Sequence, residues 1–235
     1  MTFSRSFLRV TAICSFLSVA TTLALIFLPR LYGPVDSFDK RIALVENPFY
    51  TLRAWVYLLH PFVVLPAALG IAVVLRRVAS GAIAVGFLGF LLWAFTEAAQ
   101  QVLTLVVFGR WARAFLSADA AAQDVLRTQI ATYDAVWDAM FLLLLIGFLI
   151  GNVLYGIAMI KRARFDRVLG MFFLAIAFLT AASISSELGG PSLPAAFSMW
   201  LYPIVQPLAR FLIGLWLLRA QDSRADVTSS SQNHR

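Results

Sequence analysis

The sequence predicts an all-α integral membrane protein, a polytopic bundle of six transmembrane helices with both termini in the cytoplasm. Three observations lead to this fold class. Hydrophobic residues make up 61% of the 235 residues, and the mean hydropathy is +0.83. Charged residues make up only 13%, against roughly 25% in soluble domains. The apolar residues also gather in long runs. This composition excludes a soluble enzyme, a disordered chain and a nucleic-acid-binding module.

Six apolar runs approach or exceed the roughly 20 residues that a helix needs to cross the hydrocarbon core. They cover residues 8–28, 54–75, 81–108, 131–160, 168–186 and 195–218. The first run could also be a signal peptide, but it is longer than the usual apolar stretch of about 7–15 residues and no A-x-A site follows it. We therefore expect a retained helix. Prolines are expected to kink the second and sixth spans.

The basic residues predict the orientation, because Lys and Arg are enriched in short cytoplasmic loops. The formal net charge is +7, and the cations flank the apolar runs, so lipid headgroups explain them better than nucleic acid does. Alternate loops fall on opposite sides of the membrane, and the two sides differ in their content of Lys and Arg. The side predicted to be extracytoplasmic holds seven, together with several acidic residues. The side predicted to be cytoplasmic holds eleven: Arg5, Arg9, Arg76, Arg77, Lys161, Arg162, Arg164, Arg167, Arg219, Arg224 and Arg235.

Three segments outside the spans have their own character. Residues 36–45 predict a short surface helix, and the Ala-rich segment 115–130 predicts a helix that begins at Ser117 as N-cap and continues into the fourth span. Residues 221–235 are polar and are predicted to be a disordered cytoplasmic tail. The domain division is therefore a six-helix transmembrane domain at 1–220 followed by that tail.

The depth of each charge follows from its distance along a helix to the nearest loop. Asp138 stands 23 residues before Lys161, about 34 Å away, so it reaches the outer interface of a core about 30 Å thick. Asp134 lies one turn further out. Glu97 lies near the middle of the third span, and Arg210 lies roughly 13 Å from the inner boundary. Because charges in hydrocarbon are costly, Glu97 and Arg210 mark either a function or a specific pairing.

Polar residues recur at i,i+4 spacing on four of the predicted spans, which places each pair on one helix face. If these faces turn inward together, they form a polar, acid-rich pocket that opens to the outside. We therefore name Glu97, Arg210, His60, Gln101, Asp138 and Asp134 as candidate binding residues. The four pairs are Glu97 with Gln101, Asp134 with Asp138, Ser183 with Glu187, and Gln206 with Arg210.

Structural interpretations stand beside this one. Glu97 and Arg210 are equally explained as an ion pair between helices. The structural interpretation is preferred for Asp134 and Asp138, as a solvated helix entrance favoured by the helix dipole, and for His60, as a polar packing residue before Pro61. Gln100 and Gln101 are candidates for hydrogen bonds across helices.

Several kinds of chemistry are excluded by residue counts. The lone Cys14 permits no intrachain disulfide, and His60 is the only histidine outside the tail, so a bis-His haem is excluded. Both lysines lie outside the apolar runs, which excludes a retinal Schiff base. H-E-x-x-H, G-x-S-x-G and Walker motifs are absent from the sequence. No catalytic residue, metal ligand or cofactor is assigned.

Three function hypotheses remain. The first is binding or transport of a small molecule, a cation or a lipid-like ligand through the outward-facing pocket, with Glu97 as the deep anchor. The second is a membrane-embedded enzyme that uses Glu97, His60 and Asp138 as acid, base or metal ligands. The third is a structural or regulatory subunit. The expected partner is the lipid bilayer of the cytoplasmic membrane, with no nucleic acid, and a homo-oligomer is compatible with each hypothesis.

The chain also resembles a family of six-helix bacterial membrane proteins of unknown function. The resemblance rests on a short first span, Asn47-Pro48-Phe49-Tyr50-Thr51-Leu52-Arg53, the turn at Arg76-Arg77, Phe95-Thr96-Glu97-Ala98-Ala99, and Phe165-Asp166-Arg167-Val168-Leu169-Gly170 after a fourth helix that ends within 151–161. It covers most of the chain. It implies a bacterial inner-membrane topology and assigns no activity and no catalytic residues.

Overall fold

The computed structural model describes residues 5–162, 164–191, 194 and 201–232 of the chain. It confirms the predicted all-α fold class, since the described residues form helices joined by short turns and none of them is in a β-strand. The helices are α1 (Arg5–Phe27), η1 (Leu28–Leu31), α2 (Phe38–Ala43), η2 (Leu44–Glu46), α3 (Pro48–Leu103), the π-helix η3 (Thr104–Phe108), α4 (Gly109–Ser117), α5 (Ala120–Ile160), α6 (Arg164–Glu187) and α7 (Tyr202–Gln232).

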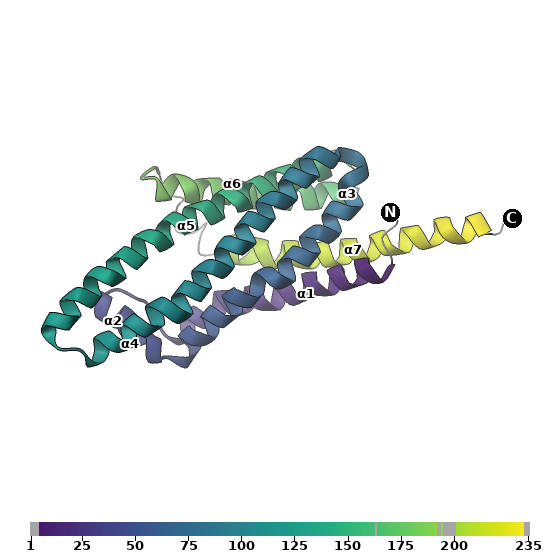
Figure 1. The fold of residues 1–235 in the computed structure, drawn as a ribbon. Coiled ribbons are helices and arrows are strands. Elements are labelled where there is room, and N and C mark those ends of the chain that lie inside the picture. Colours follow the sequence, from purple (N-terminus) through teal and green to yellow (C-terminus); the bar gives the residue numbers. More distant parts are fainter. Residues whose placement is uncertain (1–4, 163, 192–193, 195–200, 233–235) are drawn as a thin grey trace.

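Five helical stretches among the described residues are long and apolar enough to cross a membrane, by length and composition. One of them, Pro48–Ser117, would be about 105 Å long if it were straight. It is not straight, because Ala79 has φ −152° and ψ 60°, and α3 folds back there into two antiparallel arms (Figure 1). Each arm exceeds the length needed to cross the hydrocarbon core. The predicted total of six spans agrees with this hairpin and stays a prediction.

Helix starts follow local capping chemistry. The Asn47 side chain accepts hydrogen bonds from the backbone N–H groups of Phe49 and Tyr50 and so begins α3. Ser37 caps α2, which lies within the predicted surface helix at 36–45. The prediction that Ser117 is an N-cap is wrong: Ser117 ends α4, and Asp119 accepts from the N–H of Ala122 to begin α5. A carboxylate two residues further on serves the same donors at least as well.

The break in α3 falls where the sequence separates its second and third predicted spans. Ala79 has the non-helical backbone angles recorded within that helix, and it lies between the spans predicted at 54–75 and 81–108. Pro61 and Pro66 lie inside α3, and the kinks expected there stay a prediction. Another expectation differs from the structure. Residues 221–232 belong to α7, although disorder was predicted from 221 onward. Neither proline nor glycine stands in this segment to end the helix.

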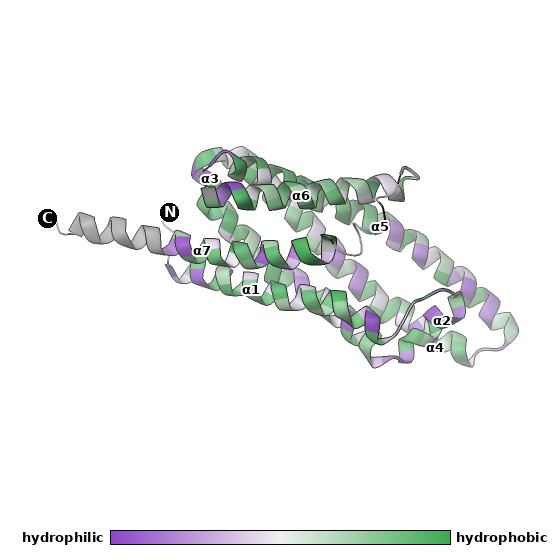
Figure 2. Cartoon of the chain, turned by 180° about the vertical axis from the view of Figure 1, so that it is seen from behind, coloured by the Kyte–Doolittle hydropathy of each residue, from purple (hydrophilic) through white to green (hydrophobic). Residues whose placement is uncertain are grey.

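Beyond the expected membrane core, α4 and α5 project as a helical hairpin. The 41 residues of α5 span about 60 Å, twice the thickness of the hydrocarbon core. We call α2, α4 and the first half of α5 the helical cap. It has its own apolar cluster, separate from the core of the bundle, and Figure 2 shows alternating polar and apolar bands along this half of α5. The buried members are Ile42, Phe108, Ala112, Phe115, Ile130 and Tyr133.

The predicted basic residues of the α1 start, the Ala79 turn and the α5–α6 junction lie at the end of the bundle opposite the cap. The N-terminus of α1, the turn at Ala79 with Arg76 and Arg77, and the junction of α5 with α6 all lie there (Figure 1). At this basic end Asp166 accepts from Arg162 at 2.7 Å and from the Trp216 indole at 2.6 Å. The charges of short loops are thus separated along the bundle axis, as the positive-inside pattern requires.

The second arm of α3 crosses α5 at glycine-to-glycine contact. A Cβ built on Gly89 would lie 2.7 Å from the Gly147 carbonyl oxygen and 2.9 Å from the Gly151 amide nitrogen. A Cβ on Gly147 would lie 2.8 Å from the Gly89 carbonyl oxygen. The two backbones touch here because none of these residues has a side chain, as in small-xxx-small helix pairs in membranes. The crossing fixes how the two helices diverge toward the cap.

We predict that Gly89→Ala destabilises the protein by about 1–3 kcal/mol, because the added methyl must push two backbones apart. Thermal unfolding in detergent micelles measures the change. Gly81→Ala is the matched control, since a Cβ at Gly81 meets nothing within 4 Å. An equal melting temperature for Gly89→Ala and Gly81→Ala would contradict the close crossing.

Candidate functional site

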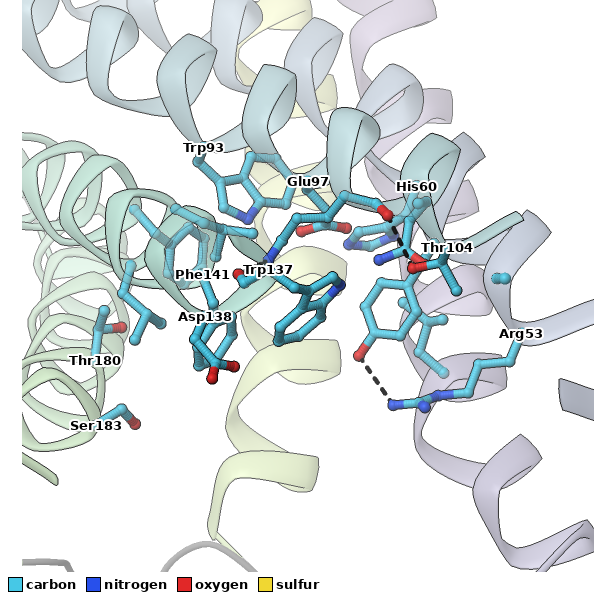
Figure 3. Close-up of a pocket in the computed structure, with 18 of the residues that line it drawn as sticks. Arg53, His60, Trp93, Glu97, Thr104, Trp137, Asp138, Phe141, Thr180 and Ser183 are labelled. Carbon is cyan, nitrogen blue, oxygen red and sulfur yellow. Dashed lines mark hydrogen bonds between the residues drawn. The ribbon is translucent and has the colours of Figure 1, made fainter. Parts of the chain in front are cut away.

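A cavity of about 1040 Å³ lies between the helices on the cap side of the glycine crossing. Its wall is built from both arms of α3 and from α1, α5, α6 and α7, with one residue of α2 (Figure 3). The structure brings all six predicted binding residues to this wall: Glu97, Arg210, His60, Gln101, Asp138 and Asp134. The convergence of the polar helix faces, expected from i,i+4 spacing, is therefore found. Their role in binding stays a prediction.

The polar residues of the wall form a gradient from buried to exposed. Glu97 is 6% exposed, Arg210 is 9% exposed, and His60, Gln101 and Gln206 are also buried. Asp138 and the serines at 183 and 186 of α6 are exposed. Because all of these groups line one space, the buried set forms its floor and the exposed set its mouth. The deep placement predicted for Glu97 and Arg210 agrees with this arrangement.

Glu97 is the most unusual group on the floor. Trp93 stands one turn earlier on α3, and its side chain lies beside the carboxylate on the same cavity wall (Figure 3). The carboxylate oxygen Oε1 is buried and has no hydrogen-bond partner in the structure. Arg210 interacts electrostatically with both Glu97 and His60. An unsatisfied buried acceptor costs about 1–3 kcal/mol, so Oε1 is the oxygen of this carboxylate that is open to a further donor.

His60 joins α1 to the second arm of α3. Its Nδ1 lies 2.7 Å from the Thr21 hydroxyl oxygen, and its ring meets the Trp93 ring edge-on at 6.0 Å between centroids. Which of the two groups donates depends on the tautomer of His60. These contacts satisfy the structural interpretation of His60 while leaving the ring on the cavity wall.

The backbone beside the floor is also held by side chains. Ser15 of α1 donates a hydrogen bond to the Arg210 carbonyl oxygen at 2.6 Å. Gln100 donates to the Trp137 carbonyl oxygen at 2.9 Å, which is the bond across helices that the sequence suggested. Thr104, the first residue of the π-helix, donates to the Gln100 carbonyl and lies 2.8 Å from the Tyr133 hydroxyl. The position of the floor is therefore fixed by α1, α3 and α5 together.

The two aspartates of α5 have different surroundings. Asp134 forms a bidentate ion pair with Arg41 of α2, with Nη1 donating to Oδ2 at 2.7 Å and Nη2 donating to Oδ1. The Arg41 guanidinium also lies 4.8 Å from the centroid of the Phe108 ring. The hydrogen bonding with Asp134 raises the pKa of Arg41 above its usual value. Asp138, one turn further along α5, is exposed at the mouth. Only Asp138 has the solvent-exposed position, with no ion-pair partner among the described residues, that the sequence predicts for both aspartates.

Arg53 is a wall residue that sequence reasoning missed. Its Nη1 donates to the Tyr32 hydroxyl oxygen at 3.0 Å and its Nη2 to the Tyr57 hydroxyl oxygen at 3.4 Å. Its Nε is buried and has no hydrogen-bond partner in the structure. The signal was present in the sequence, since Arg53, Tyr57 and His60 stand at i, i+4 and i+7 on one helix face.

The expected excess of acids in the pocket is wrong. Among the described residues the wall holds three arginines, at 41, 53 and 210, and three acids, at 97, 134 and 138. Glu187, one of the acids assigned to the pocket, is exposed at the end of α6 and does not line it. The balance changed because Arg41 and Arg53 reach the wall from segments that the sequence placed in the outer loops.

The described residues contain no group of three or more His, Cys, Asp and Glu side chains placed to hold a metal ion. We therefore assign no metal ligands. The fold and the cavity together define a helical, multi-pass membrane protein with a charged cavity at one end of its bundle. Neither a family model, nor a curated protein, nor a solved structure matches the chain. The resemblance to six-helix bacterial membrane proteins stays a prediction.

We predict that the Arg41–Asp134 pair holds α2 against α5 within the helical cap. The two side chains are 31% and 33% exposed, so the coupling between Arg41→Gln and Asp134→Asn should be about 1 kcal/mol or less and should shrink with added salt. Denaturant titration of both single variants and the double variant in mixed micelles measures it. The control is the exposed pair Lys40–Asp36, for which we expect a smaller coupling. Equal coupling energies in the two cycles would contradict this role.

Proposed function

We propose that the protein binds a small amine-bearing molecule in this cavity, with Glu97 as the carboxylate that accepts the ammonium N–H. The single observation that carries the proposal is Glu97 Oε1, a buried carboxylate oxygen on the cavity wall without a hydrogen-bond partner. Hydrogen bonds between charged groups are stronger than neutral ones. An ammonium group is the ligand donor that gains most from this oxygen.

The size and lining of the cavity support a small-molecule ligand. Ligand sites in proteins commonly have volumes of about 300–1,000 Å³, and this cavity lies at the upper end of that range. Aromatic rings flank the polar floor, among them those of Trp93, Trp137 and Phe141 (Figure 3). Tyr57 also lines the cavity. Such rings attract cations through their negative faces. The combination of a carboxylate and aromatic faces favours an organic ammonium ion over a bare metal cation.

Glu97→Gln tests this proposal, because it keeps the shape of the side chain and removes the charge. We expect the affinity for 2-phenylethylamine to fall at least about tenfold, as a charged hydrogen bond contributes about 1.5–3 kcal/mol. Intrinsic fluorescence measures binding, since Trp93 and Trp137 line the cavity. The uncharged analogue 2-phenylethanol should bind both proteins alike.

Glu187→Gln is the matched control, because Glu187 is an exposed carboxylate of the same bundle end that does not line the cavity. It should leave the affinity for the amine unchanged. An unchanged preference for the amine over the alcohol in Glu97→Gln, or the absence of saturable amine binding to the native protein, would overturn the proposal.

Transport is a second candidate, and one observation favours it. A second, mainly apolar cavity of about 50 Å³ starts at the floor, where Phe148, Gln206 and Arg210 line both spaces. It continues toward the basic end along residues such as Ile71 and Ile213. A ligand held at Glu97 would lie at the start of this second cavity.

Uptake of the same amine into proteoliposomes tests transport. Uptake that depends on Glu97 would add transport to binding, and binding without uptake would restrict the function to binding.

We also propose that the protein lies in the cytoplasmic membrane with its basic end on the cytoplasmic side, so that the cavity opens outward. The separation of the basic residues from the cap supports this orientation. A reporter fused after Arg235 measures it: green fluorescent protein should fluoresce there, and alkaline phosphatase should be inactive. Active phosphatase at this position would reverse the topology.

A further inference from the structure

We infer that Arg53 and Tyr57 form an anion-binding subsite in the same cavity, so that its ligand is a zwitterion. The ammonium group of the ligand would meet Glu97, and a carboxylate or phosphate group would meet Arg53. The first half of this statement rests on the proposed function, and the second half rests on observations of Arg53 alone.

Arg53 is a partly buried cation whose partners are neutral. Its two terminal nitrogens donate to phenol oxygens, and none of the ion pairs found among the described residues includes it. A guanidinium removed from water without a counter-ion loses solvation that phenols replace only in part. Its buried Nε–H has no acceptor at all. An anionic ligand would supply both the missing charge and the missing acceptor.

The Tyr57 hydroxyl group can donate a hydrogen bond to an anion beside Arg53. Because the Tyr57 oxygen accepts a hydrogen bond from Arg53, its own proton is free to be donated elsewhere. Tyr57 lines the cavity beside Arg53. An anion next to Arg53 would therefore meet the Nε–H edge of a planar guanidinium and a phenol O–H. Carboxylate and phosphate groups are the anions that match such a donor fork.

Arg41, a second arginine on the same cavity wall, already has an anionic partner within the chain. It lines the same cavity, but both of its terminal nitrogens donate to Asp134 and its face lies against Phe108. A ligand anion at Arg41 would have to displace a carboxylate. At Arg53 it would displace nothing charged. The contrast selects Arg53 as the ligand-binding arginine of the two.

The two subsites belong to one cavity, and residues on its wall connect them. Arg53 and His60 stand seven residues apart on one arm of α3, about 10 Å along the helix. His60 packs against Trp93, which stands one turn before Glu97 on the other arm. Arg53, Tyr57 and Glu97 all line the same cavity. The inferred ligand therefore carries its ammonium and anionic groups several bonds apart, either as a free solute or as an aminophospholipid headgroup.

The experiment compares matched pairs of probes that differ only in the anion: O-phosphoethanolamine with ethanolamine, and 6-aminohexanoate with 6-amino-1-hexanol. Tryptophan fluorescence of the full chain measures each affinity. We expect at least one zwitterion to bind about tenfold or more tightly than its amine. Arg53→Gln should abolish this advantage and leave amine binding in place, while Arg53→Lys should restore part of it.

Arg110→Gln is the control, because Arg110 is exposed and does not line the cavity. It should keep the full advantage of the zwitterion. Nanodiscs of phosphatidylethanolamine and of phosphatidylcholine distinguish the two sources of the ligand. A fluorescence change that occurs only with phosphatidylethanolamine, and that Arg53→Gln abolishes, would identify a lipid headgroup.

The outcomes separate this inference from the proposed function. If amines bind through Glu97 but neither the soluble zwitterions nor the lipid shows an advantage that depends on Arg53, the anion subsite is refuted and the amine site stands. If neither amine nor zwitterion nor lipid binds, both are refuted. An equal zwitterion advantage in Arg53→Gln and in the native protein also refutes the subsite.

Discussion

The close contact of Gly89 with Gly147 and Gly151 is the constraint on which the rest of the structure depends. Water drives helices together in soluble proteins, but lipid tails are as apolar as leucine, so helix association in a membrane rests on close packing. Three residues without side chains let two backbones touch. The apolar core of the bundle packs around this point. On the cap side the same helices border the cavity.

The charges near this cavity are each stabilised differently, and the differences carry the functional argument. Asp134 is neutralised by Arg41. Arg53 donates to two phenol oxygens, and Glu97 has a buried oxygen without a partner. Chains do not retain incompletely satisfied buried charges without a gain elsewhere, because each costs several kcal/mol of effective solvation. The proposed binding site rests on the incomplete partners of Glu97 and Arg53, because a set of purely structural ion pairs would leave neither group incomplete.

The helical cap shows how residues outside the expected membrane core shape the site. The continuation of α5 beyond the core places Asp134 where the short helix α2 can reach it, and Arg41 then joins segments 93 positions apart in the sequence. Arg127 lies 4.3 Å from the centroid of the Phe38 ring and adds a second link between α2 and α5. The cap thus forms part of the cavity wall.

The sequence by itself determined the fold class, the continuity of the fourth span with its preceding helix, and the set of deep polar residues. These are local properties, because hydropathy and the spacing of residues along a helix do not depend on partners. The tertiary structure decided the Arg41–Asp134 pair, the place of Arg53 on the wall and the even balance of charges in the cavity. Those features depend on which helices touch, and helix contacts are set by backbone approach at Gly89 and by the hairpin at Ala79.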